Sequence, residues 1–297
     1  MRGQLPAVPG RVKEPKGPAK NGRERDLDRG RGPCDECAVR RALLLLALAL
    51  AAGATALALL WAALPDPAPL ATANPRTTAL IEQRRAEARA AGRRFQPRRT
   101  WLPLEGISRS LVDAVILSED ARFYAHGAFD WQEIEAATSD RLDSSRALRG
   151  ASTITQQLAK NLWLGTQRTV WRKAKEAVLA VKVERALRKR RILALYLNVA
   201  EWGDGAFGAE AAARDRFGTS AADLSTAQAA LLAAMLPAPL RADLSRPPRW
   251  LARRSRHVLD LLLEAGRIDA AEHASASAEL ERILAGASGP DEDPDEP

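Results

Sequence analysis

The chain has 297 residues, a formal net charge of +8 and two cysteines, which is enough sequence for one large domain or two small ones. The positive charge does not indicate a nucleic-acid-binding protein, because residues 65–297 hold 34 basic and 31 acidic residues and no recognition motif. Disulfides are excluded from that part as well, since Cys34 and Cys37 both precede it.

The two cysteines form a single Cys-x-x-Cys, "CDEC", with no histidine or second cysteine pair beside it. Half of a zinc site and a redox pair are the functional alternatives. Because no further metal ligand lies beside them, we expect that the two cysteines have no specific function.

Residues 1–41 are rich in Pro, Gly, Lys and Arg, and we predict a disordered basic leader there. Residues 42–64 form an uncharged apolar run of 23 residues, long enough to cross a hydrocarbon core of roughly 30 Å. A buried core helix and a cleaved signal peptide are the alternatives. The length of the run argues against both, so we predict one transmembrane helix.

Charge on the two sides of the apolar run predicts its orientation. The leader holds 11 basic and 6 acidic residues, and Arg40 and Arg41 lie directly against the run. Because cytosolic flanks carry the excess of Lys and Arg, we expect a cytosolic N-terminus and export of everything after Leu64.

After the run, residues 65–107 are predicted to form a proline-rich linker with a first charged helix at 77–93. The pattern over residues 108–284 is helical almost throughout, with Ala, Leu, Arg and Glu dominating and few alternating β-branched residues. The predicted fold class is therefore all-α. Residues 285–297 are acidic, and we predict a disordered tail.

The helix predicted from Ser108 ends in a carboxylate on its apolar side. Val112, Val115 and Ile116 form a stripe with helical spacing, and the next position of that stripe is Glu119. Such a carboxylate is partly desolvated, which raises its pKa and suits it to proton transfer. Asp120 lies about 100° further around and should point elsewhere. This stretch alone equally fits a carboxylate that faces solvent.

Residues 150–164 are predicted to form one amphipathic helix with an unusual polar side. Ile154, Leu158 and Leu162 lie on one side and should face a core. The other side carries hydroxyls, amides and one lysine, with no acid to pair with it. Its members are Thr153, Gln156, Gln157, Lys160 and Asn161.

A further helix begins near Arg172 and is apolar on almost every side, which predicts that it is buried and that Glu176 faces a protein-lined cleft. Arg172 and Lys173 in its first turn suit an anion at the helix N-terminus. An ordinary surface pair between Arg172 and Glu176 is the alternative.

Together, five stretches resemble the motifs of the family-51 peptidoglycan glycosyltransferases, in the family's order. They are "EDARFYAHGAFD" at 119–130, "GASTITQQLAKNL" at 150–162, "RKAKEA" at 172–177, and residues 190–218 and 224–239. The resemblance covers roughly residues 74–260, and monofunctional biosynthetic transglycosylases match best. It implies a lysozyme-like helical domain over residues 108–284, with a mobile cover at 138–149.

The resemblance implies that the chain polymerises lipid II, a disaccharide-pentapeptide carried on undecaprenyl diphosphate. The growing chain would be transferred to the 4-hydroxyl of lipid II with inversion, forming β-1,4 linkages and releasing undecaprenyl diphosphate. A diphosphate leaves without protonation if cations stabilise it, so one base and a cluster of cations suffice. By match to the motifs, Glu119 is the base, and Glu176 orients the donor or binds a divalent cation.

Further roles follow from the same match. Lys160, Arg172 and Lys173 would stabilise the diphosphate, while Ser152, Thr153, Gln156, Gln157 and Asn161 would bond sugar and phosphate oxygens. Asp120, Phe123 and His126 are supporting residues. No cofactor is obligatory and no residue is assigned to a resident metal, although a divalent cation, Mg or Mn, at the diphosphate stays open.

The implied location is the bacterial inner membrane, crossed once, with the catalytic domain in the periplasm. The implied partners are lipid II, the growing glycan strand, the membrane and other cell-wall synthesis proteins. Transpeptidase activity is not expected, because no Ser-x-x-Lys occurs and few residues follow Pro239. A lytic transglycosylase or muramidase, which needs only one Glu, and a non-enzymatic membrane scaffold are the rival interpretations.

Overall fold

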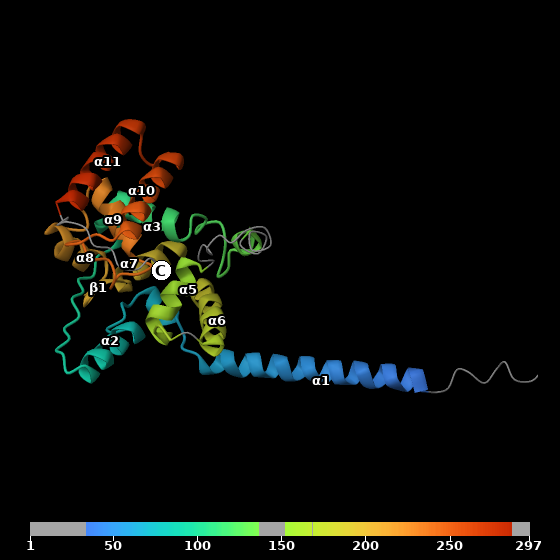
Figure 1. The fold of residues 1–297 in the computed structure, drawn as a ribbon. Helices are drawn as coiled ribbons and strands as arrows, with labels where there is room; N and C mark the ends of the chain where they lie inside the picture. The colour runs from blue at the N-terminus through green and yellow to red at the C-terminus, as the bar shows by residue number, and fades with distance from the viewer. Residues whose placement is uncertain (1–33, 137–151, 168, 287–297) are drawn as a thin grey trace, which may run out of the picture. The chain divides into compact units, whose positions relative to one another are not determined.

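The computed structural model describes residues 34–136, 152–167 and 169–286 (Figure 1). It divides into two compact units, Met1–Leu59 and Leu60–Pro297. Most of the predicted leader, the whole predicted cover at 138–149 and all but the first two residues of the predicted tail lie outside the described residues.

The first unit contains most of α1 (Cys34–Ala63). This helix begins eight residues before the predicted start of the span, because no proline or glycine separates Cys34 from the apolar run. Residues 38–63 form the one helix in the described part of the chain that is long and apolar enough to cross a membrane. None of its hydropathy window is buried by protein, as expected of a helix surrounded by lipid.

The second unit is mostly helical, which confirms the predicted class. Its elements are η1 (Ala68–Ala71), α2 (Ala79–Ala90), η2 (Leu104–Gly106), α3 (Arg109–Glu119), α5 (Ile154–Ala159), η3 (Lys160–Leu164), α6 (Val170–Ala186), α7 (Lys189–Val199), β1 (Glu201–Gly203), β2 (Ala206–Phe207), α8 (Ala209–Phe217), α9 (Thr226–Met235), α10 (Arg249–Glu264) and α11 (Ala270–Ala285). Among the described residues, the two short antiparallel strands form the only sheet.

Helix α9 lies at the centre of the core. Ser225 and Gln228 form a capping box at its start, and every residue from Ala229 to Met235 is buried. Its small alanines allow close approach, and α3, α8, α10 and α11 all pack against it (Figure 1). Helix α3 ends at the cleft described below, and α10 faces it. Both helices therefore pack against the same central helix, α9.

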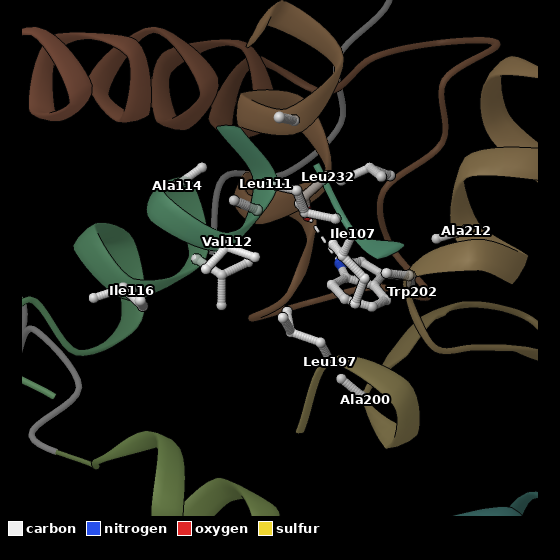
Figure 2. Packing of buried hydrophobic residues seen from close by; sticks show 14 of the residues in the cluster. Ile107, Leu111, Val112, Ala114, Ile116, Leu197, Ala200, Trp202, Ala212 and Leu232 are labelled. Carbon is white, nitrogen blue, oxygen red and sulfur yellow. Dashed lines mark hydrogen bonds between the residues drawn. The ribbon is translucent and has the colours of Figure 1, made fainter. Parts of the chain in front are cut away.

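A buried tryptophan joins α9 to the hairpin. The Trp202 indole N–H donates to the carbonyl oxygen of Leu232 at 3.0 Å, and Figure 2 shows the ring among Ile107, Leu197 and Ala212. This bond satisfies the polar edge of a side chain that is otherwise fully buried.

The helix predicted over residues 150–164 differs in its start and in its type: α5 begins at Ile154, and residues 150 and 151 lie outside the described part of the chain. Thr153 caps α5 and accepts from the Gln156 N–H at 3.2 Å, because a threonine oxygen satisfies an unpaired donor of the first turn. From Lys160 the chain continues as a single π-helical stretch, η3, which ends at Gly165 with φ 70°. The wider turn changes the direction of every side chain from Lys160 onward relative to an ideal α-helix.

Helix α6 is buried along one side only, which corrects the prediction of a helix buried all round. Its buried residues are Glu176, Leu179, Ala180 and Val183, whereas Val178 and Val181 are half-exposed. The reason is that α6 packs against α5 and α7 on that side. Glu176 lies on the buried side, as expected.

Candidate active site

A cleft of about 570 Å³ opens where the end of α3, the start of α5 and the middle of α10 meet. The polar residues of its lining include Glu119, Ser152, Thr153, Gln157, Arg254 and His257. The cleft thus joins distant segments of the chain, since Glu119 and His257 are 138 residues apart in the sequence.

Glu119 lies at the end of the apolar stripe of α3, and only 9% of its side chain is exposed. Oε2 accepts from the Gln157 amide N–H at 2.8 Å, and Oε1 accepts from the Arg254 guanidinium at 2.7 Å. Burial raises the pKa of Glu119, although Gln157, Arg254 and Lys160 act in the opposite direction. The expected desolvated carboxylate is confirmed, and the interpretation as a solvent-facing group is wrong.

Arg254 was not predicted from the sequence. It lies three residues after buried Leu251 and four before buried Val258, so it occupies the apolar stripe of α10. The same signal that identified Glu119, a charge where the helical period requires an apolar residue, would have found it. Its buried Nε has no hydrogen-bond partner among the described residues.

Asp120 lines the same cleft as Glu119 and joins two motifs. Its Oδ2 accepts from the Ile154 backbone N–H at 2.9 Å, at the start of α5, and its Oδ1 lies 2.6 Å from Nε2 of His126. The His126 Nδ1 lies 2.8 Å from the carbonyl oxygen of Gly127. These contacts hold the loop after Glu119 against α5, which is a structural role for both residues.

The third supporting residue, Phe123, is fully buried in the same loop. Its ring meets Tyr124 edge-on with centroids 5.1 Å apart, and the Lys189 ammonium lies 4.4 Å from its centroid.

Asp120, His126 and Asp130 each place one potential ligand atom within 4.8 Å of the others. However, Asp130 accepts two bonds from the Arg122 guanidinium, at 2.5 and 3.0 Å, and one from the Glu133 N–H. Arg122 holds the pKa of Asp130 below its usual range. A cluster closed by its own cation and backbone donors does not fit a metal ion.

Replacing Asp120 by Ala should destabilise the fold. Alanine has no acceptor, so the Ile154 N–H and the His126 ring both lose their partner. Leaving one buried group unsatisfied costs about 1–3 kcal/mol, which a thermal melt would record as a lower Tm. An unchanged Tm would contradict the joining role given to Asp120.

The second acidic residue of the site, Glu176, is 3% exposed and fully paired. Its two oxygens accept from the Arg172 guanidinium and from the Lys173 ammonium, each at 2.5 Å. Lys173 also donates to the Ser152 hydroxyl at 3.0 Å and to the Gln156 amide oxygen at 3.3 Å. The burial of Glu176 excludes the ordinary surface pair.

Lys160 is half-buried, and its ammonium has no hydrogen bond or ion pair within the described residues. Burial lowers the pKa of its ammonium, and the neighbouring charges of Arg172 and Lys173 lower it further, against the opposing effects of Glu176 and Glu119. An unpaired cation at this position agrees with the sequence-based expectation.

The predicted polar side divides into two groups. Thr153 and Gln156 are buried, and both donate to the carbonyl oxygen of Ala128, at 3.0 and 3.3 Å, so much of their bonding capacity is used within the fold. Gln157 bonds Glu119 directly. Asn161 is buried, and Ser152 lines the cleft. Substrate contacts for these side chains stay predictions.

Comparison with known proteins adds to this geometry. The family model described as Transglycosylase matches residues 85–263, which include every site residue named above. The chain belongs to the transglycosylase family. All the contacts around Glu119 and Glu176 therefore lie within the transglycosylase domain.

Two curated relatives show how far the similarity extends. The transglycosylase is 46% identical, over 183 residues, to the biosynthetic peptidoglycan transglycosylase of Laribacter hongkongensis, covering 62% of this chain and 80% of the relative. It is 51% identical over 156 residues to the protein of the same name from Methylobacillus flagellatus, covering 52% of this chain and 68% of that one.

A solved structure, penicillin-binding protein 1A from Haemophilus influenzae, is 20% identical with a TM-score of 0.38. The match covers 62% of the transglycosylase and 18% of that longer chain.

Proposed function

We propose that this transglycosylase polymerises lipid II into the glycan strands of peptidoglycan. The growing chain, linked to lipid diphosphate, is transferred to the 4-hydroxyl of lipid II with inversion, which forms a β-1,4 linkage and releases undecaprenyl diphosphate. The observation that best supports this reaction is the environment of Lys160. It is a half-buried cation without a partner in the described chain, and its electrostatic neighbours include both Glu119 and Glu176.

Glu119 acts as the general base. As the 4-hydroxyl oxygen of lipid II attacks the anomeric carbon, the hydroxyl proton passes to a carboxylate oxygen of Glu119, and the bond from that carbon to the diphosphate oxygen breaks. A base whose pKa is raised toward the working pH transfers protons efficiently. Arg254 and Gln157 each occupy one oxygen of the carboxylate and leave a further lone pair on each.

Lys160, Arg172 and Lys173 receive the leaving diphosphate. With Glu176 included, this group carries three cations and one carboxylate, a net of two positive charges. The buried Nε of Arg172 has no partner among the described residues, so it is a donor still available to a phosphate oxygen. Fixed cations stabilise the charge that develops on the diphosphate, and no general acid is needed.

Glu176 does not fit a resident divalent cation in this arrangement. Both of its oxygens are already held by Arg172 and Lys173, and two adjacent cations repel a metal ion. No step of the proposed mechanism passes through a metal. Glu176 instead orients Arg172 and Lys173 toward the diphosphate.

The enzyme is proposed to lie in the bacterial inner membrane with its N-terminus in the cytosol. The excess of basic residues before α1 supports this orientation. A reporter that works only outside the cytosol should give signal when fused at Gly286. A silent fusion that is well expressed would reverse the orientation and remove access to the exported substrate.

We also propose that the enzyme has no transpeptidase activity, because the chain contains no Ser-x-x-Lys. Fluorescent penicillin should leave the purified protein unlabelled, since no serine has the lysine spacing of that nucleophile. Covalent labelling that is abolished by boiling the protein beforehand would contradict this.

The function is tested with two substrates in parallel. The protein in detergent should convert labelled lipid II into glycan strands and leave purified peptidoglycan intact. Release of soluble fragments from peptidoglycan, with lipid II untouched, would identify a lytic enzyme instead. The cation group favours the synthetic reaction, because cleavage of a finished strand expels an alcohol and gives the cations nothing to bind.

A further inference from the structure

A buried tyrosine lies one hydrogen bond behind the Glu119 carboxylate. The Tyr196 hydroxyl donates to Oε1 of Gln157 at 2.9 Å, and Nε2 of the same amide donates to Oε2 of Glu119 at 2.8 Å. Tyr196 is 1% exposed and comes from the last turn of α7. It does not line the cleft, so it reaches the site only through Gln157.

The three groups must bond in this direction. An ionised carboxylate only accepts hydrogen bonds, so Gln157 has to turn its NH₂ toward Glu119 and its carbonyl oxygen toward Tyr196. The phenol must then be the donor. Burial raises the pKa of Tyr196 well above its usual value, so the hydroxyl keeps its proton throughout the working range.

We propose that Tyr196 is a positioning residue of the transfer reaction, which acts through Gln157 to hold the Glu119 carboxylate in its reactive orientation without touching substrate. This rests on the proposed role of Glu119 as the base. Without the hydroxyl, Oε1 of Gln157 loses the side-chain donor that it has among the described residues, and the amide turns away from Glu119 to satisfy this oxygen elsewhere. Glu119 would then keep Arg254 alone and lose the geometry that proton transfer requires.

Loss of the Gln157 bond also changes the titration of Glu119. Gln157 lowers the pKa of Glu119, so its release raises that pKa further. Within the described residues, the Tyr196 hydroxyl donates to Gln157 and to none of the other charged and titratable groups around the carboxylate. They are Lys160 on η3, Asp120 and Arg122 in the loop after α3, Glu133, and Arg254 and His257 on α10.

The test compares Tyr196→Phe with Tyr124→Phe in the full-length protein. The chain has two tyrosines, and Tyr124 is 55% exposed and outside the Glu119 cleft. Initial rates of labelled lipid II polymerisation are measured against substrate concentration and pH. For Tyr196→Phe, kcat should fall roughly tenfold, less than the ~10²–10⁴ for removal of a base. The KM for lipid II should stay unchanged, and the acidic limb of the plot of kcat against pH should move to higher pH. Tyr124→Phe should match the wild type.

A double-mutant cycle separates positioning from general loss of stability. Gln157→Ala should reproduce the fall in kcat and the pH shift, and adding Tyr196→Phe to it should cause no further loss. Additive losses, or a Gln157→Ala enzyme with the wild-type kcat and pH profile, would overturn the inference even if Tyr196→Phe folds poorly. A wild-type protein that does not polymerise lipid II would instead overturn the proposed function.

Discussion

Glu119→Gln is expected to lower the rate of lipid II polymerisation by about 10² to 10⁴ while the protein stays folded and still binds lipid II. Glutamine has nearly the same shape and can still accept from Arg254, but its amide cannot take the proton of the attacking hydroxyl. The measurement is polymerisation of labelled lipid II, with circular dichroism to confirm the fold.

Glu281→Gln is the matched control, because it makes the same chemical change in an exposed carboxylate paired with Arg256 on the surface. It should polymerise lipid II at the wild-type rate. Near wild-type turnover in Glu119→Gln would show that the base is assigned wrongly and would make Glu176 the candidate.

The same carboxylate predicts the acidic limb of the wild-type pH profile. Proton uptake by Glu119 removes the base, so the rate should fall as the pH drops through its pKa. Because burial raises that pKa, the midpoint should lie above the ordinary value of about 4.5. In Glu119→Gln the residual rate should lose this limb.

Lys160→Met is expected to lower kcat by about 10² to 10³, the usual cost of removing one preorganised group that stabilises developing negative charge. Substrate affinity should weaken as well, because the cation also attracts the diphosphate of the bound ground state. Steady-state kinetics with lipid II would separate the two effects.

The stability of Lys160→Met should change in the opposite direction. Lys160 is a half-buried cation whose pKa burial lowers, and it has no partner in the described chain. Methionine has a similar volume without a desolvated charge, so the Tm should stay equal or rise while activity falls. A marked loss of Tm would indicate that Lys160 has a structural partner instead of an absent ligand.

Lys175→Met is the control for both measurements. The Lys175 ammonium lies 5.4 Å from the ring centroid of Trp171, and Lys175 is not among the residues that line the Glu119 cleft. Its replacement should leave polymerisation unchanged.

Local sequence determined the features that depend on one segment at a time. The apolar run predicted α1, because spanning depends on length and the absence of charge. The stripe of Val112, Val115 and Ile116 predicted a desolvated Glu119, because helical periodicity places all four on one side. Motif order predicted the family.

Tertiary structure alone decided which distant groups meet. Arg254 reaches Glu119 across 135 residues of sequence, and Tyr196 reaches Gln157 across 39. Periodicity assigns each of these residues to a side of its own helix, but it does not say which other helix covers that side. For the same reason, the sequence of α6 predicts burial on every side of the helix, although α5 and α7 cover only one side of it. The sequence therefore identified the carboxylate that does the proposed chemistry, and the packing of α5, α7 and α10 around it decided what holds that carboxylate in place.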